Sequence, residues 1–195
     1  MASSRINKVY IDIDDTLNSF TLRCLRFFGC PVGDFDYDKF PVECGFDIVR
    51  ACKELGGGEY NLKEFWNAVP RRVWYTCPKS EVFDAILYAA QEITTRDKIF
   101  LLTSPTKCPE CLAGKLDWIT DNMPEWIHRQ YFITPRKSEL SRPGRLLIDD
   151  ADKNIDAWRA GGGEGLLVPR PWNRLHTSGT LSTVNQQLFS YLSKQ

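Results

Sequence analysis

The spacing of apolar and polar residues along the chain predicts strands that alternate with helices. Short apolar runs bounded by turn residues are typical of buried strands, and apolar residues repeated every three to four positions are typical of amphipathic helices. Strands are predicted at 9–11, 98–103, 131–133, 145–150 and 165–168. Helices are predicted at 20–28, 61–69, 80–93, 111–122, 153–160 and 183–192. This alternation favours an α/β fold with a parallel sheet and right-handed crossovers.

Two stretches interrupt the pattern. Prolines and glycines break residues 29–58 into short mixed segments, and residues 71–78 carry Trp74 and Tyr75 in a predicted loop. Aromatic residues in a loop either cover a small part of the core or offer a stacking surface to a flat ligand, and the sequence leaves both open. The helix predicted after this loop begins with Ser80 as its N-cap.

The first predicted strand ends in an acidic cluster, D-I-D-D-T, which starts at Asp12. Side chains of an extended segment point to alternate faces, so Asp12 and Asp14 are expected to project together while Ile13 turns toward the core. Two carboxylates held side by side repel unless a cation, a proton or a reacting group lies between them. The alternative is a plain acidic loop in which Asp15 or Thr16 caps a helix.

Polar side chains also follow other predicted strands. Thr103, Lys137 and Asp149 come at or just after strand ends, as Asp12 does. Ligands bind to parallel sheets beyond the carboxyl ends of the strands, so these side chains are expected at one edge. Oxygen ligands of this kind favour Mg²⁺ bridged to phosphate, which makes phosphoryl transfer the expected chemistry. One carboxylate can attack phosphorus to form an acyl phosphate, and a second can move the proton.

Composition and charge limit the partners that the chain attracts. Its 195 residues suit one domain, or a core with a small insert, and 25 Lys and Arg balance 25 Asp and Glu. Zero net charge does not favour a long nucleic acid or a membrane surface as partner. No stretch is long and apolar enough to span a bilayer, and the N-terminus lacks an apolar signal core, so a cytoplasmic location is expected.

The seven cysteines, without a secretory signal, favour reduced thiols over a disulfide framework. Only Cys108 and Cys111 have the C-x-x-C spacing of a zinc or redox site. No second such pair and no nearby histidine pair accompanies them. Small apolar side chains are therefore the favoured interpretation, and metal binding by this pair is left open.

Four motifs, in this order, resemble the signature of the haloacid dehalogenase (HAD) superfamily. They are D-I-D-D-T from Asp12, F-L-L-T ending at Thr103, Lys137, and I-D-D ending at Asp150. The resemblance implies a Rossmann-like three-layer core with a small helical cap inserted after the first strand. It also implies Asp12 as the nucleophile and Asp14 as the general acid and base, as in the phosphatase and mutase branches.

The same resemblance implies Mg²⁺ as the cofactor and a small phosphomonoester as the substrate. The metal would be held by Asp12, the backbone carbonyl of Asp14 and Asp149. Asp150 would steady the site or a metal-bound water, and Thr103 and Lys137 would contact the phosphate.

A narrower likeness concerns T-S-P-T-K from Thr103 to Lys107, followed by Lys115 and T-P-R-K, which resembles the 5'(3')-deoxyribonucleotidase family. It implies a core of residues 1–17 and 94–195 and a cap of residues 18–93. Ser104 would add phosphate or sugar contacts. Substrate contacts are implied for Phe20, Trp74, Tyr75, Lys107, Lys115 and Arg136.

Three departures from that family leave the substrate open. P-R-K stands where the family commonly has R-D-K, Asp15 replaces a common glycine, and the loop between Lys137 and Asp149 is longer. The resembled nucleotidases form dimers, so a homodimer is also left open.

The resulting hypothesis is a Mg²⁺-dependent phosphomonoesterase that acts on (deoxy)nucleoside monophosphates through an aspartyl-phosphate. One alternative is a HAD phosphatase for another small phosphometabolite or for a nucleic-acid phosphate end. Another is a non-catalytic binding module with the same fold. The module is disfavoured because it would be expected to lack one of Asp12, Asp14, Lys137 and Asp149, and all of them are present.

Overall fold

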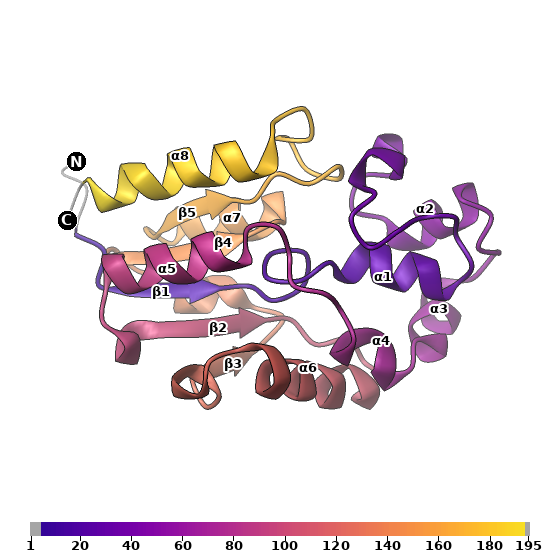
Figure 1. Cartoon of the computed structure of the whole chain (residues 1–195), viewed down its shortest axis with the longest axis horizontal. Coiled ribbons are helices and arrows are strands. Elements are labelled where there is room, and N and C mark those ends of the chain that lie inside the picture. Colours follow the sequence, from indigo (N-terminus) through magenta and orange to yellow (C-terminus); the bar gives the residue numbers. More distant parts are fainter. Residues whose placement is uncertain (1–4, 194–195) are drawn as a thin grey trace.

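A parallel sheet forms the centre of the computed structural model, which describes residues 5–193 (Figure 1). The strands are β1 (Lys8–Ile11), β2 (Ile99–Thr103), β3 (Tyr131–Ile133), β4 (Arg145–Asp149) and β5 (Glu164–Leu167). Their order is β3-β2-β1-β4-β5, and every neighbouring pair is parallel. The predicted α/β fold with a parallel sheet is therefore confirmed. Because β1 is central, its carboxyl end lies between those of β2 and β4.

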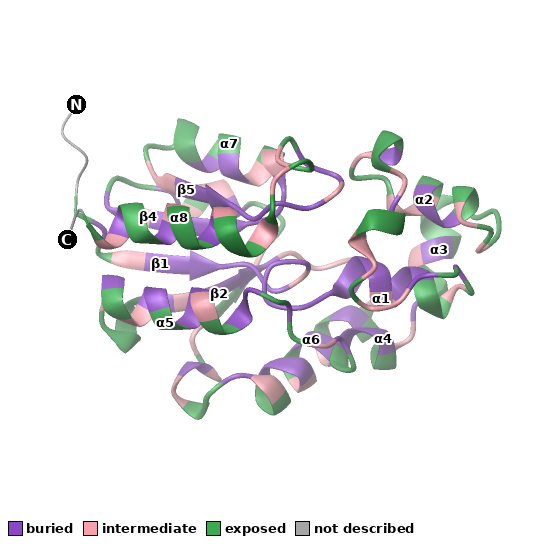
Figure 2. Ribbon diagram, turned by 45° about the horizontal axis from the view of Figure 1, so that its top comes forward, coloured by how far each residue is buried: buried purple, intermediate pink, exposed green. Residues whose placement is uncertain are grey.

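Helices cover both faces of this sheet and complete the three layers. On one face α5 (Phe83–Ile93) packs against α8 (Thr180–Leu192). On the other face α7 (Asp152–Ala160) packs against β4 and β5 (Figure 1). Figure 2 shows buried strands and exposed outer sides of α5 and α8, as amphipathic helices on a sheet require.

The side chains of β1 explain how the central strand joins both layers. Val9 and Ile11 belong to the larger core cluster, which includes residues of α5 and α8. Tyr10 points to the opposite face and joins the cluster that contains Trp158 of α7, where the two rings lie 5.2 Å apart edge to face. This alternation is what a strand buried on both faces requires.

A group of short helices lies beyond the carboxyl ends of the strands (Figure 1). They are α1 (Phe20–Phe27), α2 (Ile48–Glu54), α3 (Leu62–Ala68) and α4 (Arg71–Tyr75). α6 (Pro109–Asn122) connects β2 to β3 and packs against α4. Short 3-10 helices occur at Tyr37–Lys39, Val42–Cys44, Arg96–Lys98, Glu125–Ile127 and Lys137–Leu140. None of the helices within residues 5–193 has the length and hydrophobicity needed to cross a bilayer.

Two short helices differ from the sequence prediction. The predicted loop at 71–78 is wrong in its first half, because Arg71–Tyr75 form α4. This helix has 5 residues, too few to show an apolar period, and it is stabilised by packing against α6. The prediction also lacks α2, which is 7 residues long and lies among glycines. Asp47 caps α2 by accepting hydrogen bonds from two backbone N–H groups of its first turn.

The predicted role of Ser80 as N-cap is also wrong. α5 begins at Phe83, and no side chain caps it. The Ser80 hydroxyl instead donates to the backbone carbonyl of Thr16 at 2.7 Å. The hydroxyl is therefore used to tie the chain back to the loop after β1.

The expected cap, residues 18–93, includes α5, but α5 packs on α8 over the sheet. An antiparallel bridge between Asn18 and Lys79 joins the point where the chain leaves the sheet region to the point where it returns. We therefore propose that the cap comprises residues 18–79 and that α5 belongs to the core. The rest of the chain would then form the predicted HAD-like core.

Gly114 of α6 provides a test of the contact between α4 and α6. A Cβ atom at this position would lie 2.7 Å from the carbonyl oxygen of Arg71 and 2.7 Å from Cβ of Trp74. In an open helix interior, replacing glycine with alanine stabilises by about 0.5–1 kcal/mol. Gly114→Ala is instead expected to destabilise the chain by about 1–3 kcal/mol, because the packed backbones must separate. Urea unfolding measures the difference, and a gain in stability would contradict this packing.

Candidate active site

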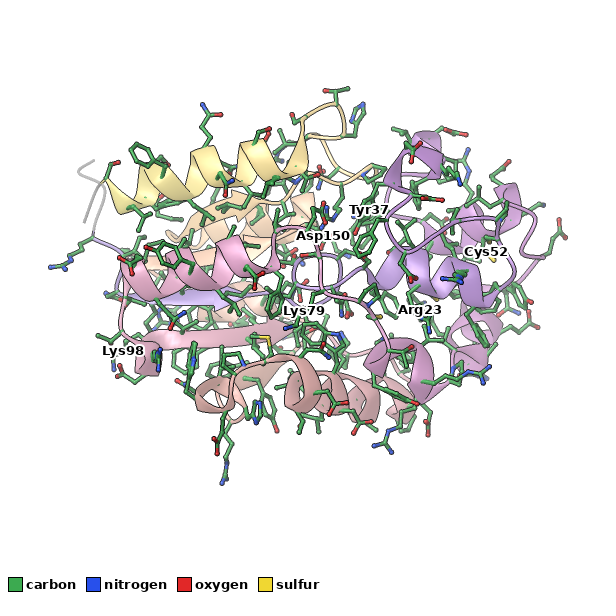
Figure 3. All side chains as sticks on the ribbon, viewed as in Figure 1. Arg23, Tyr37, Cys52, Lys79, Lys98 and Asp150 are labelled. Atoms are coloured by element: carbon green, nitrogen blue, oxygen red, sulfur yellow. The ribbon has the colours of Figure 1, made fainter. Side chains whose placement is uncertain are left out.

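A cavity of about 730 Å³ lies at the carboxyl ends of β1, β2 and β4, beneath the helices of the proposed cap. In Figure 3, Asp150 lies where the strand ends meet the helices of the proposed cap, near Tyr37. Polar side chains of the strand ends line the cavity, and we call this group its polar end: Asp12, Asp14, Thr103, Ser104, Lys137 and Asp150. Aromatic side chains also line the cavity, and we call this group its aromatic end: Phe20, Phe40, Phe46, Trp66 and Trp172. The two groups adjoin where Trp172 donates to Asp150.

Lys137 holds two carboxylates together at the polar end. Its Nζ atom lies 2.7 Å from Oδ2 of Asp12 and 2.7 Å from Oδ2 of Asp149. Only 3 % of Lys137 is exposed. Although burial alone would lower it, the charges of Asp12 and Asp149 raise the pKa of Lys137 above its ordinary value. The lysine is therefore charged, and it fixes the Asp12 carboxylate, whose Oδ1 accepts from the N–H of Ile13 at 2.8 Å.

Lys115 forms a buried ion pair with the Asp14 carboxylate. Its Nζ lies 2.6 Å from Oδ2 of Asp14 and donates to Oγ1 of Thr103 at 2.7 Å. It also donates to the carbonyl of Ser104. Lys115 is buried and is not among the side chains that line the cavity. The substrate contact that the sequence predicts for Lys115 stays a prediction, and its position suits it to orienting Asp14 and Thr103.

The two aspartates at the end of β4 have different surroundings. Asp149 is fully buried, and its oxygens accept from the N–H of Ala151, from Asn154 and from Lys137. Asp150 lines the cavity, and its Oδ2 accepts from Nε1 of Trp172 at 2.6 Å. Burial raises the pKa of Asp149, although Lys137 opposes the shift. Burial, followed by the charge of Asp15, raises the pKa of Asp150 well above its ordinary value.

The acidic group fits a hard cation. Oxygens of Asp12, Asp149 and Asp150 lie within 4.8 Å of one another. Oδ1 of Asp14 is buried and has no hydrogen-bond partner among residues 5–193. A buried cluster of carboxylates is costly without a compensating positive charge, and an all-oxygen set suits Mg²⁺. The observed hydrogen bonds leave Asp150 better placed than Asp149 to act as a ligand.

Asp15 has the capping role that the sequence left as an alternative. Its carboxylate accepts from the N–H of Thr21 at 2.9 Å and from Oγ1 of Thr21 at 2.7 Å, at the start of α1. Its φ of 58° lies in the left-handed region that non-glycine residues seldom adopt. Burial raises the pKa of Asp15 to about 7. Nε of Arg170, itself buried, donates to the backbone carbonyl of Asp15 at 2.7 Å.

The aromatic residues that line the cavity differ in part from those that the sequence predicts as substrate contacts. Trp74 is 1 % exposed and stacks on Phe20 at 5.5 Å between ring centroids, so it covers the core. Phe20 lines the cavity, and so does Trp66, whose ring stacks on that of Phe20 at 6.2 Å between centroids. Several expected contact residues are exposed and are not among the lining side chains: Tyr75, Lys107 and Arg136.

The loop after β5 contributes residues that the sequence analysis missed. Trp172 lines the cavity, and Asn173 donates to the backbone carbonyls of Asp150 and Val168. Arg170 comes from the same loop, P-R-P-W-N. The available signal was the position of this loop, because it follows a predicted strand whose carboxyl end lies at the same edge.

Comparison with known proteins gives partial matches. No protein-family model matches the chain. A 5'(3')-deoxyribonucleotidase of Bacillus subtilis (strain 168) and another of Bacillus phage SPbeta are each 25% identical over 84 residues. The match covers 43% of this chain and 46% of each relative, so it spans about half the length of the curated relatives.

Solved structures resemble the chain over nearly its whole length. A hydrolase from Streptococcus pneumoniae TIGR4 has a TM-score of 0.54 at 12% identity and covers 95% of this chain and 99% of its own. A HAD family hydrolase from Deinococcus radiodurans R1, solved with bound phosphate and sodium, has a TM-score of 0.51 at 14% identity. That match covers 95% of this chain and 89% of the other. The chain therefore has the same Rossmann-like α/β fold as these hydrolases, and its four motifs meet at one edge of the sheet.

Proposed function

We propose that the chain is a Mg²⁺-dependent phosphomonoesterase that hydrolyses (deoxy)nucleoside monophosphates. The observation that carries this proposal is a single cavity that is lined by both polar and aromatic side chains. Asp12, Asp14, Thr103 and Lys137 belong to the polar group, and five aromatic rings form the other. A phosphate and a flat apolar ring system on one small molecule would match both groups.

The proposed reaction divides one phosphoryl transfer into two steps. A carboxylate oxygen of Asp12 bonds to phosphorus as the ester oxygen leaves, and Asp14 gives that oxygen its proton. Water then attacks the aspartyl-phosphate, Asp14 takes a proton from the water, and Asp12 and inorganic phosphate are released. Lys137 and Thr103 would hold the phosphoryl oxygens and compensate their charge.

The cation would be held by Asp12, Asp150 and the backbone carbonyl of Asp14, with Asp149 fixing Lys137. A cation held by these residues would supply positive charge near the phosphoryl group. The ligand choice rests on the hydrogen bonds that already occupy both oxygens of Asp149.

The proposed nucleobase site is the aromatic end of the cavity. The volume of about 730 Å³ falls in the range typical of small-molecule sites. Trp66 is half-buried and stacks on Phe20 with a nearly parallel ring, so the exposed part of the Trp66 ring would offer a planar base a surface on which to stack. The partial match to 5'(3')-deoxyribonucleotidases supports the same substrate class. Self-association and a cytoplasmic location stay predictions.

A substrate panel tests this function. The full chain is incubated with ribo- and deoxyribonucleoside monophosphates, sugar phosphates and 5'-phosphorylated oligonucleotides, and phosphate release is measured with Mg²⁺ and with excess chelator. We expect a nucleoside monophosphate to react fastest, and chelation to slow it by at least about 10²-fold because charge compensation is lost. Faster release from a sugar phosphate or an oligonucleotide end would reject the substrate class. Turnover that resists chelation would reject the metal.

A further inference from the structure

Trp172 lies between the acidic cluster and the aromatic side chains of the cap. On one side its Nε1–H donates to Oδ2 of Asp150 at 2.6 Å. On the other side its ring meets Phe40 at 5.0 Å and Phe46 at 6.4 Å between centroids, both edge to face. Trp172 is 7 % exposed. A single side chain therefore contacts a proposed metal ligand and the cap.

The loop that carries Trp172 is anchored to the core. The neighbouring Asn173 donates to the backbone carbonyl of Asp150 at 2.8 Å and to that of Val168 at 2.8 Å. Arg170 of the same loop donates to the carbonyl of Asp15. These bonds tie the loop to the residues that follow β1, β4 and β5. The backbone on both sides of Trp172 is therefore anchored near Asp150, whereas the indole ring itself also packs against the cap.

On the cap side, Trp172 contacts residues 40–46, which we call the mouth segment. Phe40 of this segment is 4 % exposed, whereas Phe46 is 56 % exposed, and both line the cavity. Nζ of Lys153 from α7 lies 5.4 Å from the ring centroid of Phe46. The mouth segment thus covers the cavity by aromatic and cation–π contacts with two core residues. Such contacts are individually weak.

We propose that Trp172 is a positioning residue that orients Asp150 toward the cation and couples cation binding to closure of the mouth segment. This inference rests on the proposed function, because that function supplies the metal site. The hydrogen bond from Trp172 to Oδ2 would fix the orientation of the Asp150 carboxylate, which lies within the acidic cluster. Partners of ligating carboxylates commonly set metal affinity. Closure of the mouth segment packs Phe40 and Phe46 on the indole and restrains it in its donating position.

This coupling is reciprocal by thermodynamic necessity. If closure favours the orientation of Asp150 that binds the cation, the cation must favour closure by the same factor. Binding of the cation would therefore prepare the aromatic end of the cavity for substrate. Removal of the Phe40 and Phe46 rings, which contact Trp172, should weaken cation binding even though neither residue is proposed to hold the cation.

The first experiment titrates the full chain with Mg²⁺ alone in a calorimeter. Trp172→Phe keeps a ring against Phe40 and Phe46 but removes the N–H donor, and we expect Mg²⁺ affinity to fall about 10–100-fold. Trp158→Phe is the matched control. It also removes an indole N–H from a buried donor, here to the carbonyl of Arg145, without contact with Asp150. We expect this control to lose stability but to keep the wild-type affinity for Mg²⁺.

The second experiment measures the coupling itself. Phe40→Leu leaves the hydrogen bond between Trp172 and Asp150 in place, and we expect it to weaken Mg²⁺ binding about 5-fold. Amide hydrogen exchange across the mouth segment should slow when Mg²⁺ is added to the wild type. In Trp172→Phe at saturating Mg²⁺ this slowing should be lost. The Phe40→Leu measurement keeps the proposal testable if Trp172→Phe does not fold.

The outcomes separate this inference from the proposed function. If the wild type binds Mg²⁺ and Trp172→Phe binds it equally well, the positioning role of Trp172 is wrong and the phosphatase proposal stands. If affinity falls in Trp172→Phe but Mg²⁺ does not slow exchange in the wild-type mouth segment, the coupling is wrong. If the wild type does not bind Mg²⁺ at all, both proposals are wrong.

Discussion

Replacing Asp12 with asparagine is expected to reduce phosphate release by at least about 10³-fold while the chain still folds. The amide has the shape of the carboxylate but cannot attack phosphorus, so the aspartyl-phosphate cannot form. Folding should be retained because Lys137 keeps its ion pair with Asp149 at 2.7 Å. The measurement is phosphate release from the best nucleoside monophosphate at saturating Mg²⁺, with circular dichroism as the check on folding.

The matched control for this change is Asp156→Asn. Asp156 is an exposed aspartate of α7 that pairs with Arg174 at the surface. It lies outside the cavity-lining residues, so its variant should release phosphate at the wild-type rate. A variant at Asp12 that folds and keeps the full rate would exclude covalent catalysis by this residue.

Most of the sheet could be predicted because β1, β2, β4 and β5 are buried along nearly their whole length, whereas the edge strand β3 is mostly exposed. Buried strands read as continuous apolar runs, and each run is bounded by turn residues or acids. The helices that lie on the sheet have enough turns to show an apolar period, so α6, α7 and α8 were also predicted within a few residues. α2 and α4 were not, because 7 and 5 residues are too few for a periodic signal. Their stability comes from capping by Asp47 and from packing against α6.

The polar end of the site could be predicted because strand topology alone brings it together. Asp12, Thr103 and Lys137 follow different strands, yet the carboxyl ends of parallel strands meet at one edge. The assignment within the pair Asp149 and Asp150 could not be predicted. It depends on which carboxylate meets Asn154 and Lys137 and which meets Trp172.

The aromatic end could not be predicted, because it depends on how short helices are oriented. Trp66 and Trp74 lie on α3 and α4, and only the packing of these helices decides which ring faces the cavity. Trp74 is enclosed between Phe20 and α6, whereas Trp66 lines the cavity. The sequence left Trp74 open as core or ligand contact, and the packing selects the core.

Replacing Lys137 with methionine is expected to destabilise the metal-free chain by about 3–5 kcal/mol as well as to abolish activity. Methionine has a similar volume but no charge. Asp12 and Asp149 would then face each other in a buried site without the ammonium group of Lys137, which now lies 2.7 Å from each. Breaking a buried ion pair costs more than the pair contributes, because it leaves uncompensated charge in a medium of low polarity. Urea unfolding in the presence of chelator measures this loss.

Two further variants decide whether the loss comes from that uncompensated charge. Lys98→Met removes an exposed lysine that pairs only at the surface with Asp97, and little change in stability is expected. Lys137→Met combined with Asp149→Asn removes one of the two facing charges, and should recover much of the stability lost in Lys137→Met alone. Activity should stay absent in the double variant, because the phosphoryl oxygens still lack their lysine. If the double variant is as unstable as Lys137→Met, the lysine stabilises the fold by packing, and the electrostatic account of this site is wrong.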